Sequence, residues 1–568
     1  MLWSEVLTTL NPKTMKYIFL TLISALLLSV SWPTYGVPFF IFIALVPLLM
    51  MEHEISKFSK IKRKSWAIFG LSYLCFIIWN IVTTGWLYGS KNPDGSHSMM
   101  AVVFPVLVNS LLYSLVFQCY HWYKNAKGTY WGLAFLIAIW MSFEKFHLGW
   151  QLTWPWLNLG NAFSEYPKII QWYDTFGATG GSFWILCVNI LFFYTLRIWE
   201  AGRKRKNLII NSSITLGLIV FPMLISLYKY HSFNEKPIGQ VNALMLQPDL
   251  DPYNEKYSKD SLTILNELLT LAEENSKGKI DFYIAPETSI PGSGSISEGG
   301  FESSLLLNNV KTFLQKHPGS VFESGISSHR FFFNETEKPD NAYEINNGVW
   351  VESYNSAVQI IPNQKVEVYH KGKLVPGVEI FPYMNVLKPI LGDAMLNLGG
   401  TVASLGIDKE RTAFANPYNK GKMAPIICYE SIYGEFTTEY VKKGANFLGI
   451  MTNDSWWGVT EGHQQLLSYA RLRAIETRRE IARSANSGIS AHIDAKGDVL
   501  EDTFYGDKTA LFAKINLYEG ETFYVKAGDL FSRICIFALG FLLFYLLFKK
   551  VLGKKTDGGL PKVKKNLN

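Results

Sequence analysis

Charge and cysteine are both scarce in this sequence of 568 residues. Charged residues make up 18%, whereas hydrophobic residues make up 48% and aromatic residues 15%. Such a composition excludes a disordered chain and is more apolar than that of an ordinary soluble protein. Five cysteines in a chain of this length exclude a disulfide framework. The sequence also lacks metal-ligand spacing and a glycine-rich phosphate loop, so we expect no metal and no cofactor.

Charge is absent altogether from long stretches of residues 1–230. Five of them contain 22 to 35 uncharged residues, namely those between Lys16 and Glu52, Lys64 and Lys91, Asp94 and Lys124, Asp174 and Arg197, and Lys206 and Lys229. A transmembrane helix needs about 20 apolar residues. A stretch of 16 uncharged residues before Glu144 and a final one over Ile534–Phe548 are two further candidates.

The first stretch contains Pro33, Gly36 and Pro38, so it is either one long span or a hairpin of two. The basic clusters decide between the two. With a hairpin, the clusters at 13–16, 57–64, 124–127, 197–206 and 549–565 all lie on one side, where 21 basic residues face five acidic ones. This is the positive-inside pattern, and a single first span would place residues 57–64 on the wrong side.

The sequence therefore predicts eight transmembrane helices. Seven belong to a membrane domain over residues 1–230, and the eighth spans 527–548, followed by a basic tail over 549–568. We expect both termini in the cytoplasm and residues 238–520 outside it. The basic clusters are interpreted as topology signals and anionic-lipid contacts, not as a nucleic-acid site.

Residues 238–520 carry ordinary charge and alternate between strand and helix patterns. Short apolar segments predict about nine strands, at Val241–Leu246, Asp281–Ala285, Ser320–Ile326, Ala357–Ile361, Val366–Tyr369, Ala424–Ile427, Asn446–Met451, Ile489–Ile493 and Ala510–Ile515. Broad apolar faces predict helices over Ser261–Glu274 and Gln464–Arg483. This alternation predicts one extramembrane domain built as an α/β sandwich.

Three reactive side chains directly follow predicted strands of this domain. They are Glu287, Lys371 and Cys428, the last being the only cysteine of residues 238–520. Reactive groups of α/β sheets collect beyond the carboxyl ends of strands. Glu287 would take the thiol proton, Lys371 would stabilise a thiolate or an oxyanion, and Cys428 would hold an acyl group as a thioester. Spacing alone also allows a buried packing thiol and two solvated charges.

The segments around these residues resemble a known family. Pro286-Glu287-Thr288, Tyr369–Pro376 with Glu379 eight residues after Lys371, and Cys428-Tyr429-Glu430 resemble the Glu–Lys–Cys set of the nitrilase (carbon–nitrogen hydrolase) superfamily. Thr452–Gly458, the helix with Arg471, Arg473 and Glu476, and Trp154–Gly160 resemble its membrane-bound branch, the apolipoprotein N-acyltransferases. That resemblance implies seven membrane helices, a periplasmic nitrilase-like αββα sandwich and an eighth helix.

The resemblance also implies an activity and a location. Members of the branch move an acyl chain from a membrane phospholipid to the α-amino group of the diacylglyceryl-cysteine that begins an apolipoprotein. The enzyme would be a multi-pass protein of the bacterial inner membrane. The exchange of an ester for an amide runs downhill, and a thioester lets one site serve two bulky lipids in turn, which gives ping-pong kinetics.

Site residues are carried over from the resemblance one by one. Glu287 matches the general base, Lys371 the lysine and Cys428 the nucleophile, while Glu379 matches a supporting glutamate. Tyr429 and Glu430 are expected to support the site, and the Tyr429 N–H to contribute to an oxyanion hole. Three further residues are candidates for substrate binding: Asn453, Trp456 and Trp457. The alternative for the two tryptophans is interfacial anchoring or core packing.

The sequence departs from the family pattern at two places, with Ala285 before Pro-Glu and Gly377-Val378 before Glu379. Lys373 is a second candidate for the catalytic lysine, although the spacing to Glu379 favours Lys371. Two other functions stay open. One is a membrane-anchored amidase that uses water as acceptor, for which a single helix would suffice. The other is a non-catalytic lipid-binding protein, in which the retained Glu, Lys and Cys would have no purpose.

Overall fold

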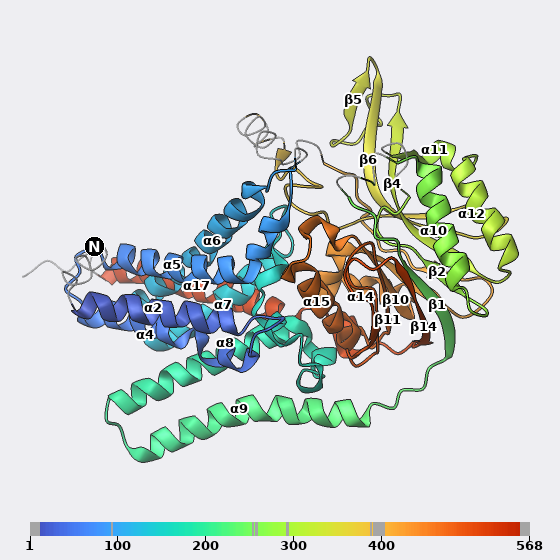
Figure 1. Ribbon diagram of the computed structural model, residues 1–568. Coiled ribbons are helices and arrows are strands. Elements are labelled where there is room, and N and C mark those ends of the chain that lie inside the picture. Colours follow the sequence, from blue (N-terminus) through green and yellow to red (C-terminus); the bar gives the residue numbers. More distant parts are fainter. Residues whose placement is uncertain are drawn as a thin grey trace, which may run out of the picture.

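The computed structural model describes the whole chain except residues 1–11, 93–94, 253–254, 256–258, 291–294, 385, 387–388, 390–403 and 557–568. A helical region and an α/β region lie end to end along the long axis of the molecule (Figure 1). The helical region comprises residues 12–232 and the C-terminal helix, and the α/β region comprises 239–517. Of the predicted basic tail, residues 557–568 lie outside the described residues.

Within the described part of the chain, seven helical segments are long and apolar enough to cross a membrane. They are Pro12–Val30, Pro38–Phe58, Lys64–Gly89, Met99–Lys127, Tyr173–Glu200, Arg205–Ser232 and Leu530–Phe548. The first two form the predicted hairpin, since the chain turns between Ser31 and Val37. Their helices are α2 (Pro12–Val30), α3 (Ile41–Ala44), α4 (Val46–Phe58), α5 (Lys64–Thr84), α6 (Met99–Lys127), α8 (Tyr173–Glu200), α9 (Arg205–Ser232) and α17 (Leu530–Thr556).

The predicted count of eight spans is too high by this criterion, and the difference is α7 (Thr129–His147). Its tyrosine and tryptophans, together with Glu144 and Lys145 near its end, lower its hydropathy. The helix nevertheless packs inside the bundle, where Tyr123 of α6 stacks on Phe135 with ring centroids 4.2 Å apart. Glu144 is fully buried and accepts hydrogen bonds from Trp140 Nε1 and Leu159 N, each at 3.0 Å.

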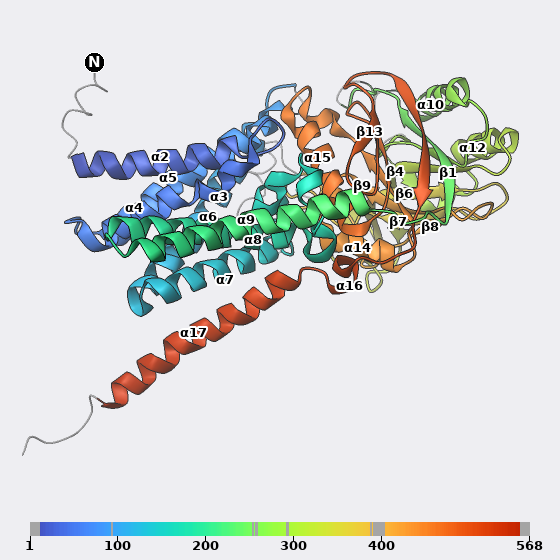
Figure 2. The same cartoon turned by 90° about the horizontal axis from the view of Figure 1, so that it is seen from below.

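Two helices lie at the periphery of the helical region. α9 runs along one side of the bundle (Figure 1), and α17 lies at its edge, where Leu542 and Tyr545 contact α6 and α7 (Figure 2). Both expose large apolar side chains, among them Phe221 and Leu224 of α9 and Phe537 and Phe541 of α17. Such surfaces are stable in contact with lipid chains and costly in water.

The α/β region is a sandwich of two sheets. One sheet has the order β14-β1-β2-β4-β6-β5, with β3 beside β4 and β7 beside β6, and the other has the order β13-β12-β11-β10-β9-β8. The strands are β1 (Gly239–Gln247), β2 (Phe282–Ile284), β3 (Ile296–Ser297), β4 (Val321–Phe332), β5 (Tyr343–Asn346), β6 (Val349–Ile360), β7 (Glu367–His370), β8 (Phe414–Ala415), β9 (Lys422–Ile427), β10 (Phe447–Thr452), β11 (Ile481–Ala485), β12 (Ala491–Ile493), β13 (Val499–Asp502) and β14 (Thr509–Leu517).

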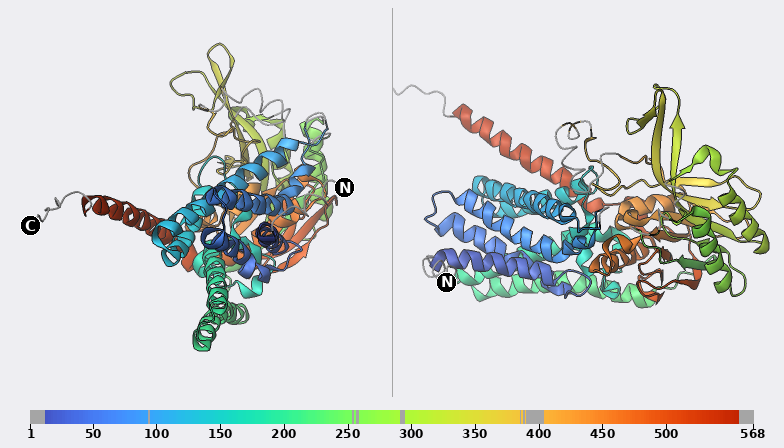
Figure 3. Two further views of the ribbon diagram at one scale, coloured as in Figure 1. Left: turned by 90° about the vertical axis from the view of Figure 1, so that its left-hand side faces the viewer. Right: turned by 45° about the horizontal axis from the view of Figure 1, so that its top comes forward.

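Helices cover the outer faces of both sheets, so the layers follow the order α–β–β–α (Figures 1 and 3). α10 (Ser261–Asn275) and α12 (Leu305–Lys316) pack on the first sheet through one apolar cluster. α14 (Gly434–Lys442) and α15 (Glu461–Thr477) cover the second sheet, and α15 faces the helical region. The predicted nitrilase-like sandwich is confirmed.

One predicted helix is too long. The segment Gln464–Arg483 contains α15, which ends at Thr477 because Arg478 adopts the left-handed conformation with φ of 53°. Residues after it form β11, which pairs with β10 in parallel and with β12 in antiparallel register. The apolar pattern did not distinguish the last turn of a buried helix from a short buried strand.

Candidate active site

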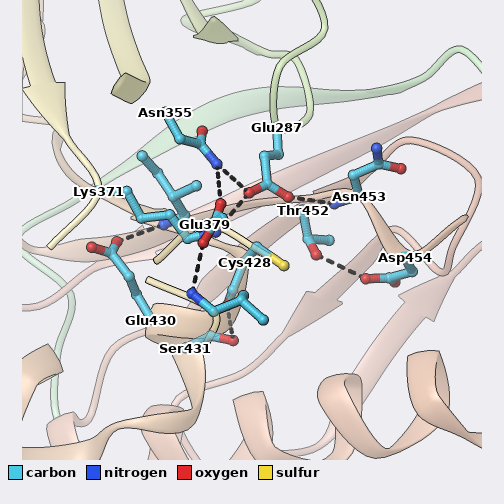
Figure 4. A network of polar contacts seen from close by, with 12 residues as sticks. Glu287, Asn355, Lys371, Glu379, Cys428, Glu430, Ser431, Thr452, Asn453 and Asp454 are labelled. Atoms are coloured by element: carbon cyan, nitrogen blue, oxygen red, sulfur yellow. Dashed lines mark hydrogen bonds and ion pairs between the residues drawn. The ribbon is translucent and has the colours of Figure 1, made fainter. Parts of the chain in front are cut away.

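The three reactive residues leave their strands at a common place between the two sheets (Figure 4). Glu287 follows β2, Lys371 follows β7 and Cys428 follows β9. β2 is parallel to β4, and both β4 and β7 are antiparallel to β6, so β2 and β7 end at the same edge of their sheet. All three side chains are buried.

The Lys371 ammonium lies between two carboxylates. Its Nζ donates to Oε1 of Glu287 and to Oε1 of Glu379, each at 2.9 Å. Burial by itself would lower the pKa of Lys371, but the charges of Glu287 and Glu379 raise it well above its usual range. Lys371 is therefore a fixed cation at the centre of the site.

Cys428 begins a 3₁₀ turn, η6 (Cys428–Ile432), directly after β9. Its φ of 46° is unusual for a residue with a side chain, and the Ser431 hydroxyl donates to the Cys428 carbonyl at 2.7 Å. Burial and the nearby charge of Glu287 raise the pKa of the Cys428 thiol, although Lys371 opposes them. The resting thiol is thus protonated, and its reaction as a nucleophile needs a base.

The chain at Glu287 passes close to β4 because Gly325 has no side chain. A Cβ atom at Gly325 would lie 2.6 Å from the Glu287 Cα and 2.4 Å from the Thr288 nitrogen. The backbone at Thr288 is itself left-handed, with φ of 47°. This close approach turns the Glu287 carboxylate toward Lys371.

Asn355 joins the cluster, and the sequence analysis missed it. Its side-chain Nδ2 donates to Oε1 of Glu287 at 2.7 Å and to Oε1 of Glu379 at 2.9 Å. Its backbone carbonyl accepts from the backbone N–H of Lys371 at 2.8 Å. Asn355 lies within β6 and not at a strand end, so neither its position nor its residue type marked it.

Glu430 and Tyr429, the predicted supporting residues, bind different parts of the molecule. Glu430 accepts from Tyr369 Oη and Gly372 N at 2.6 Å each and from Ile427 N at 2.8 Å, so it ties the lysine loop to the nucleophile turn. The hydroxyl of Tyr429 donates to the carbonyl of Thr153, in the helical region, at 3.1 Å. Glu430 thus acts on the loops that carry Lys371 and Cys428.

Lys373 points out of the cluster. Its Nζ donates to the Leu148 carbonyl at 3.1 Å and lies 5.0 Å from the ring centroid of Tyr433. Gly377-Val378, which departs from the family pattern, still allows Glu379 to reach Lys371. Gly377 turns the chain with φ of 80°, and Val375 N donates to Glu379 Oε2 at 2.8 Å. Ala285 is fully buried in the cluster that packs the first sheet on its helices.

The substrate-binding candidates lie on the loop after β10. Asn453 contributes its backbone, whose N–H donates to Oε2 of Glu287 at 3.1 Å. Trp457 is half-buried and packs edge-on against Trp86 of the helical region, with ring centroids 4.8 Å apart. Trp456 is half-buried in the same 3₁₀ turn, η7 (Asp454–Trp457). Among the residues that the structure describes, no group of three or more His, Cys, Asp or Glu could hold a metal ion.

This arrangement supports acyl transfer through a thioester. Glu287 can receive the thiol proton, and the Lys371 ammonium sits where a developing negative charge needs a partner. The rest of the set keeps these two groups oriented: Glu379 and Asn355 bind Lys371 and Glu287 from one side, and the Asn453 N–H binds Glu287 from the other.

Comparisons with known proteins agree with the geometry. The model of the apolipoprotein N-acyltransferase N-terminal domain matches residues 24–191, and that of carbon–nitrogen hydrolases matches 246–522. The apolipoprotein N-acyltransferase of Chlorobaculum tepidum is 28% identical over 93% of this chain and 96% of its own length. That of Geobacter metallireducens is 24% identical over 91% and 92%.

Similarity extends to further relatives. The apolipoprotein N-acyltransferase of Thermotoga maritima is 24% identical over 95% of both chains. Among solved structures, Saccharomyces cerevisiae Nit3, of the nitrilase superfamily, covers 50% of this chain at 13% identity with a TM-score of 0.36. Because two family models together match both regions and relatives align nearly end to end, this chain belongs to the apolipoprotein N-acyltransferase family of the carbon–nitrogen hydrolase superfamily.

Proposed function

We propose that this chain transfers an acyl chain from a membrane phospholipid to the α-amino group of the N-terminal diacylglyceryl-cysteine of apolipoproteins. The observation that carries the proposal is the buried Glu287–Lys371–Cys428 cluster in an α/β region attached to apolar helices. Relatives with the name apolipoprotein N-acyltransferase support the same reaction. Both substrates are lipids, so the site must be reached from a bilayer.

In the first half-reaction, Glu287 takes the Cys428 proton and the sulfur attacks the ester carbonyl of the phospholipid. The resulting oxyanion is stabilised by the Lys371 ammonium and the Tyr429 backbone N–H. When the carbon–oxygen bond breaks, the leaving alkoxide receives the proton from Glu287. A lysophospholipid departs, and the acyl group stays on Cys428 as a thioester.

In the second half-reaction, the α-amino group of the acceptor attacks the thioester. Glu287 takes a proton from the attacking amine, and Lys371 again stabilises the oxyanion. The carbon–sulfur bond breaks, the Cys428 sulfur recovers its proton and the amide product leaves. No ATP is needed, because an amide replaces a more reactive ester.

The proposed placement follows the charge pattern. Residues 238–520 would face the periplasm of a bacterial inner membrane, and both termini with the tail over 549–568 would face the cytoplasm. The helices of residues 1–230 and the segment 527–548 would hold the α/β region at the surface where the acyl donor lies.

Intact mass measurement tests the proposal. Purified protein incubated with phospholipid and no acceptor should gain the mass of one acyl chain on Cys428, and a lipopeptide amine should remove it. Cys428→Ala should gain no mass. Release of free product from small amides without an adduct would instead indicate a hydrolase, and no adduct and no turnover with any phospholipid class would indicate a non-catalytic lipid-binding protein.

A further inference from the structure

The loops that carry Lys371, Cys428 and Asn453 each contact the helical region. Lys373, two residues after Lys371, donates to the Leu148 carbonyl at 3.1 Å. Tyr429, next to Cys428, donates to the Thr153 carbonyl at 3.1 Å. The third contact joins the loop after β10 to η2 (Gly85–Gly89), the 3₁₀ turn that follows α5.

Residues of η2 pack closely against this loop and against the start of α15. A Cβ atom at Gly89 would lie 2.1 Å from the Trp457 carbonyl oxygen, and one at Gly462 would lie 2.6 Å from the Trp86 ring. The Trp86 ring also meets Trp156 edge-on, with centroids 4.9 Å apart. Trp86 is buried, so the contact excludes water.

Hydrogen bonds anchor this contact to the helices. Trp86 Nε1 donates to Oε1 of Gln465 in α15 at 3.1 Å. Nε2 of Gln465 in turn donates to the carbonyls of Thr83 at 2.9 Å and Pro33 at 3.1 Å. Gln465 is fully buried, so breaking these bonds would leave its amide unpaired.

The same loop reaches the cluster at its other end. Trp457 closes η7, and Asn453, at the start of this turn, donates its N–H to Oε2 of Glu287 at 3.1 Å. Lys371 and Asn355 donate to the other oxygen of this carboxylate, Oε1. A shift of η7 would therefore move a donor of the Glu287 carboxylate.

We propose that Trp86 and Gly89 of the helical region are positioning residues that hold η7, and with it the Asn453 N–H, against Glu287. This inference rests on the proposed function, in which Glu287 is the base. It implies that the α/β region does not by itself keep its base in the active orientation. A membrane-side turn completes the site.

Two matched variants of η2 test this proposal. Gly89→Ala adds one methyl group against the Trp457 carbonyl, whereas Gly85→Ala adds the same group where nothing lies within 4 Å. We expect Gly89→Ala to lower the maximal acylation rate roughly ten- to hundredfold, as small displacements of reacting groups do. The KM for phospholipid and the melting temperature should stay near wild type, and Gly85→Ala should match wild type in all three.

Two controls separate the possible failures. If Glu287→Gln acylates Cys428 as fast as wild type, the proposed function fails. If Glu287→Gln is impaired but Gly89→Ala and Gly85→Ala are equally active, the positioning role fails. Should Gly89→Ala not fold, Trp86→Phe and Trp86→Leu decide: the aromatic variant should recover most of the maximal rate, and equal rates in both would overturn the proposal.

Discussion

The Nζ atom of Lys371 and Oε1 of Glu287 lie 2.9 Å apart, and both side chains are almost wholly buried. Isolated charges are costly in such surroundings, so each requires its partner. The pair also brings the cation of the site to the group that would take the thiol proton.

Removal of the thiol should abolish transfer. We expect Cys428→Ala to lose acylation by at least roughly three orders of magnitude, the scale typical of a lost nucleophile. Far-UV circular dichroism and the elution volume in detergent should stay unchanged, because one small side chain is lost. Cys119→Ala is the matched control, since Cys119 is a half-buried thiol in α6. Full activity of Cys428→Ala would refute the thioester mechanism.

Neutralisation of the central cation should cost both activity and stability. Lys371→Met leaves the buried Glu287 carboxylate and the partly buried Glu379 carboxylate without their shared cation, and breaking a buried ion pair typically costs roughly 3–5 kcal/mol. Thermal unfolding and the acylation rate measure the two effects. Glu379→Gln keeps a polar partner for Lys371, so we expect a smaller loss of activity than in Glu287→Gln. A larger loss of activity in Glu379→Gln than in Glu287→Gln would indicate that Glu379, and not Glu287, is the general base.

The pH dependence of thiol alkylation follows from the environment of Cys428. Burial and Glu287 raise the pKa of this thiol, so the thiolate fraction is small at neutral pH. We expect the rate with iodoacetamide to rise throughout pH 6–9 without a plateau. Lys371 lowers the pKa of the thiol, so Lys371→Met should slow alkylation further at each pH. A plateau near pH 7 in wild type would contradict this reading of the site.

Glu323 should make the protein less stable as pH rises. Burial raises the pKa of this β4 carboxyl well above its usual range, and no described residue donates a hydrogen bond to its Oε2. A raised folded-state pKa means that stability is full below the unfolded value and is lost as pH climbs toward the folded value. Glu323→Gln should therefore unfold like wild type near pH 4 and at higher temperature at pH 8.

The expected gain of Glu323→Gln at pH 8 is at least about 1.4 kcal/mol, the equivalent of one pKa unit. Thermal unfolding at both pH values measures it. The matched control is Glu367→Gln on β7, which pairs with the other side of β6 and where the carboxyl is exposed. An equal effect of both substitutions would show that burial of Glu323 is not the cause.

Much of the architecture was predictable because it depends on local patterns. Charge-free stretches and a proline break predict the first two spans, which the helices α2 and α4 confirm. The uncharged stretch before Glu144 predicts a further helix, and α7 forms there. Its hydropathy falls below that of the other spans because it contains aromatic residues and Glu144, which packing within the bundle stabilises. β11 was missed because its apolar residues follow a buried helix without a turn signal.

The sequence by itself determined which reactive groups follow which strands, since Glu287, Lys371 and Cys428 are marked by strand ends and by family motifs. Only the tertiary structure decided which partners surround them. Asn355 reaches the cluster from the middle of β6, whereas Trp86 and Gly89 of η2 pack against Trp457, on the loop that carries Asn453. The physical reason is that hydrogen bonds and close packing join residues distant in the chain, whereas strand and helix patterns record only near neighbours.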